Sequence, residues 1–247
     1  MKSIALLGLV LTTFNLSAAT LYVSLESTNP VAPFATWATA ATNIQDAVDA
    51  AKDGDTVLVT NGVYATGGRA VGTSILVNRV AVERPLTLRS VNGPKDTVIQ
   101  GAKDPVAENG LGGGAVRCVY LSDGASLSGF TLTNGATSYR TVDGTGGGVW
   151  CVSTNSVVAN SVFVGNSADI GGGVIGGTLH DCTLKDNWAN EAGGAFGTTL
   201  NNCTVSANRS SYYAGGVSAS VLHNCTVRNN VGSLGGGPSA AFSTTVY

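Results

Sequence analysis

Two short motifs recur in constant phase through the second half of the chain, and this repeat limits the fold more than any other feature. The glycine motif is a pair or triplet that begins at residues 146, 171, 193, 215 and 235. The asparagine motif ends, in steps of 32, 21, 21 and 22 residues, at Asn134, Asn166, Asn187, Asn208 and Asn230. A period of about 20 to 50 residues is the signature of stacked repeat architectures.

The residues inside each repeat exclude most of these architectures. The leucine spacing of leucine-rich repeats is missing, and glycine triplets between Thr/Val runs contradict the apolar pattern of helical repeats. Short parallel strands stacked about 4.8 Å apart remain. We therefore predict an all-β chain, a single-stranded right-handed parallel β-helix over residues 56–247, with regular coils of 21 to 22 residues from about residue 146.

Stacking places equivalent residues in columns, which explains both motifs. Asparagine suits a column at a bend because its amide can bond to the copies above and below, and because it tolerates the left-handed backbone conformation. Glycine permits a corner that a Cβ atom would obstruct. The step of 32 residues after Asn134 predicts a long loop over Thr137 to Gly146 that protrudes from a corner.

Residues 20–55 are predicted to form an N-terminal strand and a helix that caps the open end of the coil. Thr42 and Gln45 have capping-box spacing, and Gly54 is expected to follow the helix as its C′ residue. One apolar stripe is formed by Ile44, Ala47, Val48 and Ala51. Further strands are predicted over residues 55–60, 74–82, 86–90, 97–100 and 116–121.

Residues 1–19 have the pattern of an export signal peptide. Lys2 supplies the positive charge, residues 4–14 form an apolar core, and residues 16–19 offer small side chains for cleavage near Ala18 or Ala19. The apolar run is shorter than the roughly 20 residues that span a bilayer. We expect the protein to be secreted or held at the cell surface, in association with an outer membrane.

The charge of the chain excludes one class of partner. The net charge is −2, only 11% of the residues are charged, and no basic run exceeds two residues. Nucleic acid binding needs a basic patch that neutralises phosphates, so no nucleic acid partner is expected. The sequence has no CxxC motif and no His/Cys cluster, so we expect no metal and no other cofactor.

The C-terminal coil is predicted to be uncapped. Aligning Gly237 with Gly216 puts Val246 where Cys225 falls one coil earlier, so the sequence stops inside a strand. Terminal repeats need a polar cap for solubility. We therefore expect either a fragment of a longer protein or end-to-end self-association through this coil.

Three of the five cysteines, Cys182, Cys203 and Cys225, share one column. Adjacent coils bring their Cα atoms within disulfide reach, but small apolar thiols also fill a narrow bore. Ser161 and Gly129 take the same place in the earlier coils of this alignment, which favours packing. The odd number of cysteines leaves at least one thiol free or paired with another molecule.

The candidate ligand-contact face is an outward column of Lys185, Ser206 and Arg228. Lys185 and Arg228 are expected two coils apart, about 10 Å, where they could contact an acidic sugar. Trp188 is an aromatic side chain able to stack on a sugar ring. An ordinary solvated face is the alternative. Catalytic residues remain unassigned, because the acidic residues after Gly146 do not fall into one column.

Two segments resemble known families. Phe163-Val164-Gly165-Asn166 and the GGA-type triplets resemble the repeats of chlamydial polymorphic membrane proteins. The helix from Asn43 and the run GDTVLVTNGVY at residues 54–64 resemble the N-terminal part of bacterial pectin-lyase-like β-helices. Both resemblances imply a parallel β-helix, a fold that hosts lyases, hydrolases and adhesins.

The two resemblances leave two functions open. The first implies a non-catalytic structural or adhesin-like module, which is the function we favour from the sequence. The second implies a carbohydrate-active enzyme, either a polysaccharide lyase or a glycoside hydrolase. The expected ligand is a polysaccharide or a molecule of a host or cell surface.

Overall fold

Threonine, valine and leucine alternate in the short strands of this chain, and the alternation decides which side chains face inward. The computed structural model describes residues 18–107, 109–139, 141, 143–233, 241–242 and 245–246. In β15 (Thr178–His180) and β16 (Thr183–Lys185), the middle leucine is buried and its two neighbours are more exposed. A period of two with β-branched residues is typical of half-buried strands.

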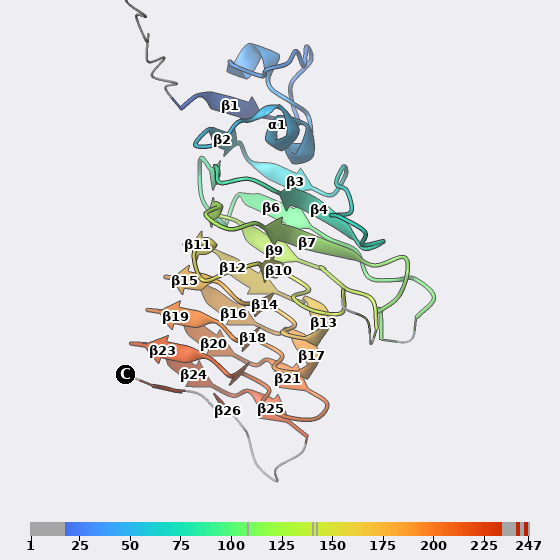
Figure 1. Ribbon diagram of the computed structural model, residues 1–247, viewed down its shortest axis with the longest axis vertical. Coiled ribbons are helices and arrows are strands. Elements are labelled where there is room, and N and C mark those ends of the chain that lie inside the picture. Colours follow the sequence, from blue (N-terminus) through green and yellow to red (C-terminus); the bar gives the residue numbers. More distant parts are fainter. Residues whose placement is uncertain are drawn as a thin grey trace, which may run out of the picture.

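The described strands pair in parallel into four sheets, so that successive coils lie one above another (Figure 1). Sheet A consists of β1 (Thr20–Val23), β2 (Thr56–Val59), β5 (Thr87–Ser90), β8 (Ser126–Ser128), β11 (Val157–Ala159), β15, β19 (Thr199–Asn201), β23 (Val221–His223) and β27 (Thr245–Val246). Sheet B consists of β3 (Gly62–Tyr64), β6 (Thr97–Gln100), β9 (Thr131–Thr133), β12 (Val162–Val164), β16, β20 (Thr204–Ser206) and β24 (Thr226–Arg228).

Sheet C runs along the coil like sheets A and B, and sheet D joins it from β13 onward. Sheet C consists of β4 (Val77–Val82), β7 (Val116–Leu121), β10 (Val149–Cys151), β14 (Val174–Ile175), β18 (Ala195–Phe196), β22 (Val217–Ser218) and β26 (Ala241–Phe242). Sheet D consists of β13 (Ser167–Ile170), β17 (Trp188–Glu191), β21 (Arg209–Ser210) and β25 (Val231–Gly232). This stack of parallel strands is the predicted parallel β-helix.

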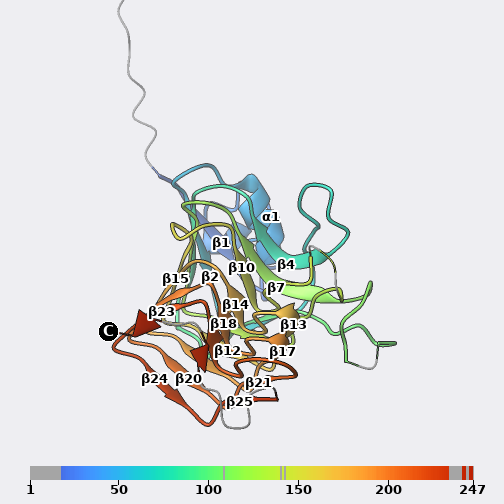
Figure 2. The same cartoon turned by 60° about the horizontal axis from the view of Figure 1, so that its bottom comes forward.

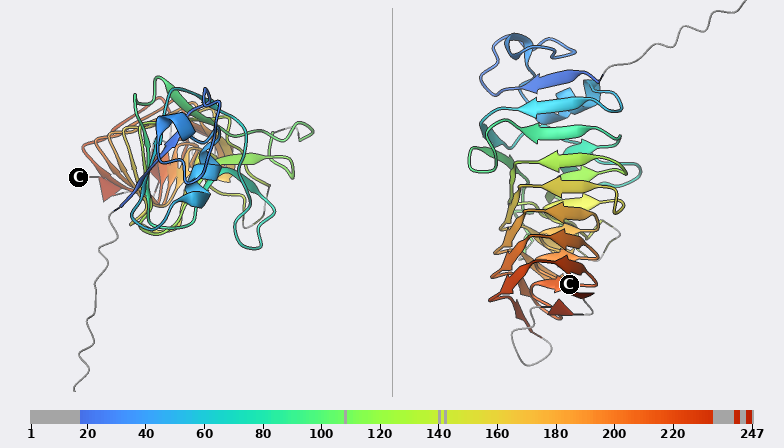
Figure 3. Two further views of the ribbon diagram at one scale, coloured as in Figure 1. Left: turned by 90° about the horizontal axis from the view of Figure 1, so that it is seen from above. Right: turned by 90° about the vertical axis from the view of Figure 1, so that its left-hand side faces the viewer.

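The stack is elongated, with β1 and the helix at one end and the red strands of the last coils at the other (Figure 3). The connections that precede β4 and β7 project from the same side of the stack in two different views (Figures 2 and 3). Among the described residues, no helix is long and apolar enough to cross a membrane.

The core is a set of apolar columns that run the length of the coil. In sheet A, strand register stacks Val57, Leu88, Leu127, Val158, Leu179, Leu200 and Leu222, all buried. In sheet B, register stacks Ile99, Leu132, Phe163, Leu184 and Val205, also buried. Each such side chain contributes about 1.5 to 3 kcal/mol when it leaves water, so the columns are a large favourable contribution to folding.

A buried ladder of asparagine amides runs beside these columns. The Nδ2 atom of Asn166 donates to Oδ1 of Asn187 at 3.0 Å, that of Asn187 to Asn208 at 2.9 Å, and that of Asn208 to Asn230 at 3.0 Å. Each of these Nδ2 atoms also donates to a main-chain oxygen, and the Oδ1 atoms of the last three residues accept the backbone N–H one coil earlier. Because these hydrogen bonds pair the amide nitrogens and oxygens named here, none of those buried polar atoms is left without a partner.

The prediction that Asn134 begins this ladder is wrong by one residue. Strand register pairs Thr133 with Val164, so Gly135 rather than Asn134 lies opposite Asn166, and the Gly135 N–H donates to Asn166 Oδ1 at 2.9 Å. Asn134 is exposed and has a φ of 59°. The left-handed position therefore lies one residue before the ladder, and Asp186 takes it in a later coil with a φ of 55°.

The glycine motif marks corners where successive backbones approach closely. A Cβ atom placed on Gly172 would lie 2.3 Å from the main-chain oxygen of Trp188, and one on Gly148 would lie 2.4 Å from that of Gly173. No side chain fits at such distances, which confirms the reason predicted for these glycines.

The N-terminal helix α1 (Ile44–Ala50) forms as predicted, with different ends. Asn43, not Thr42, is the N-cap, since its side chain accepts the Asp46 N–H at 2.9 Å. The helix ends at Ala50 with Ala51 as its C-cap, so Gly54 is not its C′ residue. Gln45 is buried, and its amide bonds to both backbone groups of Ala81 in β4, at 2.7 and 3.2 Å. Because β4 is the edge strand of sheet C, this amide replaces a missing neighbouring strand.

The register of the C-terminal strands differs from the predicted alignment. Val217 pairs with Ala241, and Leu222 pairs with Val246, which makes the last step 24 residues rather than 21. Val246 therefore lies over Leu222 in sheet A instead of over Cys225. The glycines at 235–237 lie outside the described residues.

The loop predicted to protrude over Thr137 to Gly146 packs against the coil at both ends, whereas Tyr139 and Thr141 between them are exposed. Thr137, Ser138 and Asp143 are all buried. The Gly144 oxygen accepts the N–H of Asp169 at 2.7 Å, and Thr145 forms a parallel bridge with Ile170. These bonds hold the end of the loop against β13.

Candidate functional site

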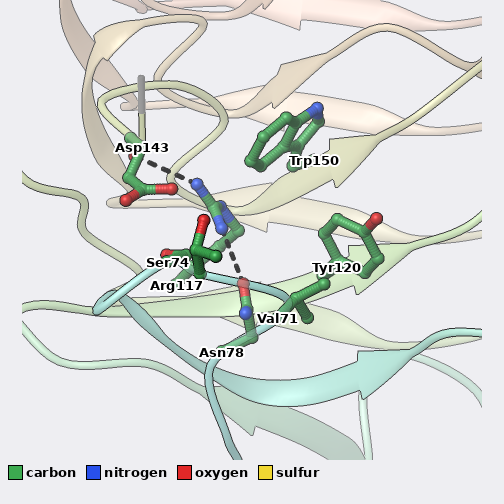
Figure 4. A pocket seen from close by; sticks show the side chains of 8 residues that line it. Val71, Ser74, Asn78, Arg117, Tyr120, Asp143 and Trp150 are labelled. Carbon is green, nitrogen blue, oxygen red and sulfur yellow. Dashed lines mark hydrogen bonds between the residues drawn. The ribbon is translucent and has the colours of Figure 1, made fainter. Parts of the chain in front are cut away.

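A cavity of about 260 Å³ lies on the outer side of sheet C, where β4, β7 and β10 run side by side (Figure 4). Strand register places Asn78 beside Arg117 and Tyr120 beside Trp150. The side chains that line it are those of Val71, Thr73, Ser74, Asn78, Arg117, Tyr120, Asp143 and Trp150. The cavity therefore lies where three segments of the chain meet: the connection that leads to β4, the strand β7, and the stretch from Asp143 to β10.

Arg117 is a fully desolvated cation at the floor of this cavity, 1% exposed. Its Nη1 atom donates to Asn78 Oδ1 at 2.6 Å, and its Nη2 atom donates to the main-chain oxygens of Asp143 at 3.1 Å and Thr145 at 2.9 Å. Its Nε atom donates to the Gly146 oxygen at 3.0 Å. The guanidinium therefore holds the C-terminal end of the loop over residues 137–146 against β7.

Burial lowers the pKa of Arg117 to about 10, although the nearby Asp143 acts in the opposite direction. The side chain consequently keeps its charge at neutral pH. Both ion pairs among the described residues belong to Arg69, with Asp49 and Glu83, so no carboxylate pairs directly with Arg117 there. Carbonyl and amide oxygens solvate this charge, and the Asp143 carboxylate lines the same cavity without forming an ion pair with it.

Two aromatic rings form one wall of the cavity. The rings of Tyr120 and Trp150 are 5.6 Å apart and meet edge to face at 81°. The Arg117 guanidinium carbon lies 4.9 Å from the centre of the Trp150 ring, within cation–π distance. Burial and the nearby Glu83 raise the pKa of Tyr120, so its hydroxyl remains protonated and able to donate.

Asp143 supplies the carboxylate of the cavity and is 8% exposed. Its main-chain oxygen accepts a hydrogen bond from Arg117, and its side chain lies on the other side of the guanidinium from Tyr120 and Trp150 (Figure 4). The arrangement offers a fixed cation, a carboxylate, an amide, hydroxyls and an aromatic surface. Such a combination suits a polar ligand with flat apolar faces.

The candidate contact residues chosen from the sequence lie elsewhere. Lys185, Ser206 and Arg228 are in register in sheet B, whereas Trp188 lies in sheet D. Trp188 packs against a small apolar cluster of Leu76, Leu111, Ala115 and Ala136. The structure therefore does not bring Trp188 into the same sheet as the two cations, and none of the three lines the cavity.

The cysteine column is present in the core of the coil, next to strands that are in register. All three thiols are free, and the pKa of Cys182 is raised by its hydrogen bond with Cys203 and by burial. The backbone N–H of Cys203 donates to the sulfur of Cys225 at 3.4 Å. Ser161, but not Gly129, is the residue that precedes Cys182 in this column, because Val162 pairs with Thr131. Over the described part of the chain, no group of three or more His, Cys, Asp or Glu side chains could hold a metal.

Arg117 and Asp143 were not among the site residues predicted from the sequence. Two signals were available: Arg117 is a charged residue within the apolar strand VRCVYL, and Asp143 lies in the long loop that the repeat spacing identified. Nothing in the spacing shows that the loop returns to β7, because Arg117 binds it through main-chain oxygens.

No protein-family model matches this chain, and no curated protein matches it in sequence. Among solved structures it is similar to a pectin methylesterase in complex with a hexasaccharide, with a TM-score of 0.51 and 15% identity over 85% of this chain. An aspartate-to-alanine variant of a pectin methylesterase, also in complex with a hexasaccharide, gives a TM-score of 0.50 at 15% identity over 85% of this chain. A rhamnogalacturonan lyase matches 93% of this chain at 13% identity, with a TM-score of 0.43.

The likeness extends over part of those proteins. The chain spans 66% of the length of both pectin methylesterase structures and 62% of that of the lyase. At 15% identity the similarity bears on the arrangement of the backbone and not on the site. The stacked sheets and this likeness together identify the chain as a parallel β-helix similar in fold to pectin methylesterase.

Proposed function

We propose that this protein binds an acidic polysaccharide at the cavity on sheet C, with one uronic acid unit inside it. The observation that supports this most strongly is the desolvated Arg117 charge at the floor of the cavity, 4.9 Å from the centre of the Trp150 ring in the aromatic wall. A sugar carboxylate would be attracted by the fixed positive charge. The apolar face of the sugar ring would lie on the indole.

The polar groups around this wall fit the remainder of a sugar. Ser74 and Thr73 present hydroxyls, and the Tyr120 hydroxyl is a donor. The volume of about 260 Å³ is close to the lower end of small-molecule sites, about 300 Å³, which favours a single unit of a longer chain. The two hexasaccharide complexes of fold neighbours support a polysaccharide as the ligand class.

The carboxylate of Asp143 is the group on which catalysis at this cavity would depend. It is the one carboxylate that lines the cavity among the described residues. Most glycoside hydrolases need two carboxylates that flank the scissile bond. A non-catalytic surface module, of the kind implied by the resemblance to polymorphic membrane proteins, is therefore the second candidate. An enzyme of this site would use Asp143 as its base or nucleophile.

The binding test uses the mature protein with polygalacturonate and with a neutral glucan. We expect binding of the polyuronate only, weakened by added salt because part of the attraction is electrostatic. Trp150→Ala should weaken binding about tenfold, equivalent to about 1.4 kcal/mol. Trp37→Ala is the matched control, since Trp37 forms another edge-to-face pair, with Tyr22, away from the cavity.

Three results would contradict the proposal: equal binding of the neutral glucan, equal loss in the two tryptophan variants, or no binding to polyuronate. Turnover is measured on the same panel by following release of methanol from methyl-esterified pectin, unsaturated product and reducing ends. Any turnover that Asp143→Asn abolishes, with binding retained, would establish an enzyme. Binding without turnover would establish the non-catalytic module.

A further inference from the structure

Asp55 is a buried carboxylate that holds the start of the first strand. It lies in the turn between α1 and β2 and is 6% exposed. Its Oδ1 atom accepts the backbone N–H of Ala19 at 2.7 Å, and its Oδ2 atom accepts that of Lys52 at 2.7 Å. The Ala19 oxygen in turn accepts the N–H of Thr56, so Ala19 is fixed at both of its backbone groups.

The carboxylate charge has no cation paired with it among the described residues, where both ion pairs involve Arg69. Lys52 approaches Asp55 through its backbone N–H and not through its ammonium group. A buried carboxylate without a cation is costly, even when N–H groups bond to it. The geometry therefore leaves a place for a positive charge at the Ala19 nitrogen.

The sequence offers a way to put a charge on that atom. Ala19 follows an export-signal pattern whose small residues permit cleavage near Ala18 or Ala19. We propose that the export peptidase cleaves the Ala18–Ala19 bond and that the new α-ammonium group of Ala19 forms an ion pair with the buried carboxylate of Asp55. This proposal builds on the export expectation and is independent of the sugar site.

Cleavage is a hydrolysis by water. The C–N bond between the two alanines breaks, the water oxygen joins the Ala18 carbonyl carbon to form a carboxylate, and the Ala19 nitrogen gains protons to become an ammonium. A neighbouring cavity of about 200 Å³, bordered by Ala19, Thr20, Lys52 and Asp55 among others, leaves room for water at the ammonium protons that do not face Asp55.

The alternative cleavage, after Ala19, has the opposite consequence. It would remove the atom that donates to Asp55 Oδ1 and the oxygen that accepts from Thr56. The buried carboxylate would then retain one backbone donor, Lys52. The structure thus favours a leader that is one residue shorter than the 1–19 segment predicted from the sequence.

The first test is the identity of the mature N-terminus. The full chain is expressed in a bacterium that exports it, and the mature protein is measured by intact mass and N-terminal sequencing. We expect the mass of a chain that starts at Ala19. A chain that starts at Thr20 or later, or one that keeps its leader, would overturn the proposal.

The second test measures the ion pair itself. Chains that start at Ala19, and at a glycine added before Ala19, are produced from a fusion whose protease leaves no extra residue. The added glycine keeps the Ala19 N–H but moves the charge away, so we expect its melting temperature to be about 2 to 4 °C lower. Asp55→Asn in both chains should remove most of this difference. Equal melting temperatures of the two chains with Asp55 intact would refute the ion pair.

Discussion

Replacing Asn187 by alanine tests whether the amide ladder holds the coil together. Asn187 lies in the middle of the ladder, 1% exposed. Its Nδ2 atom donates to Phe163 O at 3.0 Å and to Asn208 Oδ1 at 2.9 Å. Its Oδ1 atom accepts the backbone N–H of Asn166 at 3.1 Å and the side-chain N–H of Asn166 at 3.0 Å. The substitution therefore removes four buried hydrogen bonds at once.

The magnitude follows from which partners keep another bond. The Asn166 side-chain N–H group still reaches Leu132 O, but the Asn166 backbone N–H loses its acceptor in a place that water does not enter. An orphaned buried donor costs about 1 to 3 kcal/mol, and each of the other three bonds about 1 kcal/mol net, so the total is about 4 to 6 kcal/mol. Since domains are stable by roughly 5 to 15 kcal/mol, this is a large loss.

The assay is urea unfolding followed by far-UV circular dichroism, with Asn134→Ala as the control. Asn134 belongs to the sequence motif but is exposed and outside the ladder. Its replacement should cost about 1 kcal/mol, the penalty of a left-handed alanine, and Asn134→Gly should be nearly neutral. Hydrogen exchange would show whether Asn187→Ala opens the C-terminal coils before the rest, as expected of a chain of stacked repeats. Equal losses for Asn187→Ala and Asn134→Ala would refute this account of the ladder.

Three further predictions follow from buried groups. Arg117→Met should lower the free energy of unfolding by about 2 to 4 kcal/mol and abolish polyuronate binding, because the main-chain oxygens of the loop lose their donor. The control is the exposed Arg69, whose replacement by methionine should lower the free energy of unfolding by less than about 1 kcal/mol and leave binding unchanged. Burial raises the pKa of Cys118 and Cys151 to about 12, whereas the same thiols in the unfolded chain ionise at about pH 8.5. The free energy of unfolding contributed by these thiols should therefore be constant below about pH 8.5 and fall as the pH rises toward 12, and Cys118→Ala should reduce this slope. The thiols of the folded protein should also resist a disulfide reagent at pH 8. Gln45→Ala should cost about 2 kcal/mol in thermal unfolding, since both edge groups of Ala81 lose their partner; a loss no larger than that of an exposed helix residue would contradict the edge-covering role of Gln45.

The regular coils were predictable because contacts between neighbouring coils join residues that are one coil length apart, so that these contacts appear in the sequence as a repeat. Once one coil stacks on the next, Leu179, Leu200 and Leu222 must share a column, and so must the three cysteines. The predicted strands over 97–100 and 116–121 coincide with β6 and β7 for a different reason, because the alternation of residues within a strand is local.

The first coils show where the period stops being informative. Asn134 matches the motif by residue type, yet the pairing of Leu132 with Phe163 sets the register one residue away. A residue inserted into a coil shifts the pairing of the residues that follow it, although the residue types of the motif stay the same. Core packing and not residue identity therefore decides which asparagine joins the ladder, and the same applies to the last coil, where Leu222 pairs with Val246.

Composition and repeat spacing by themselves determined the fold class and, in the regular coils, the columns of Asn, Gly and Cys. The candidate site was decided only by tertiary structure. Arg117 and Asp143 are 26 residues apart, in non-repeating segments, and they meet because a guanidinium binds main-chain oxygens. Every residue type has such oxygens, so the sequence contains no pattern that could have revealed this contact.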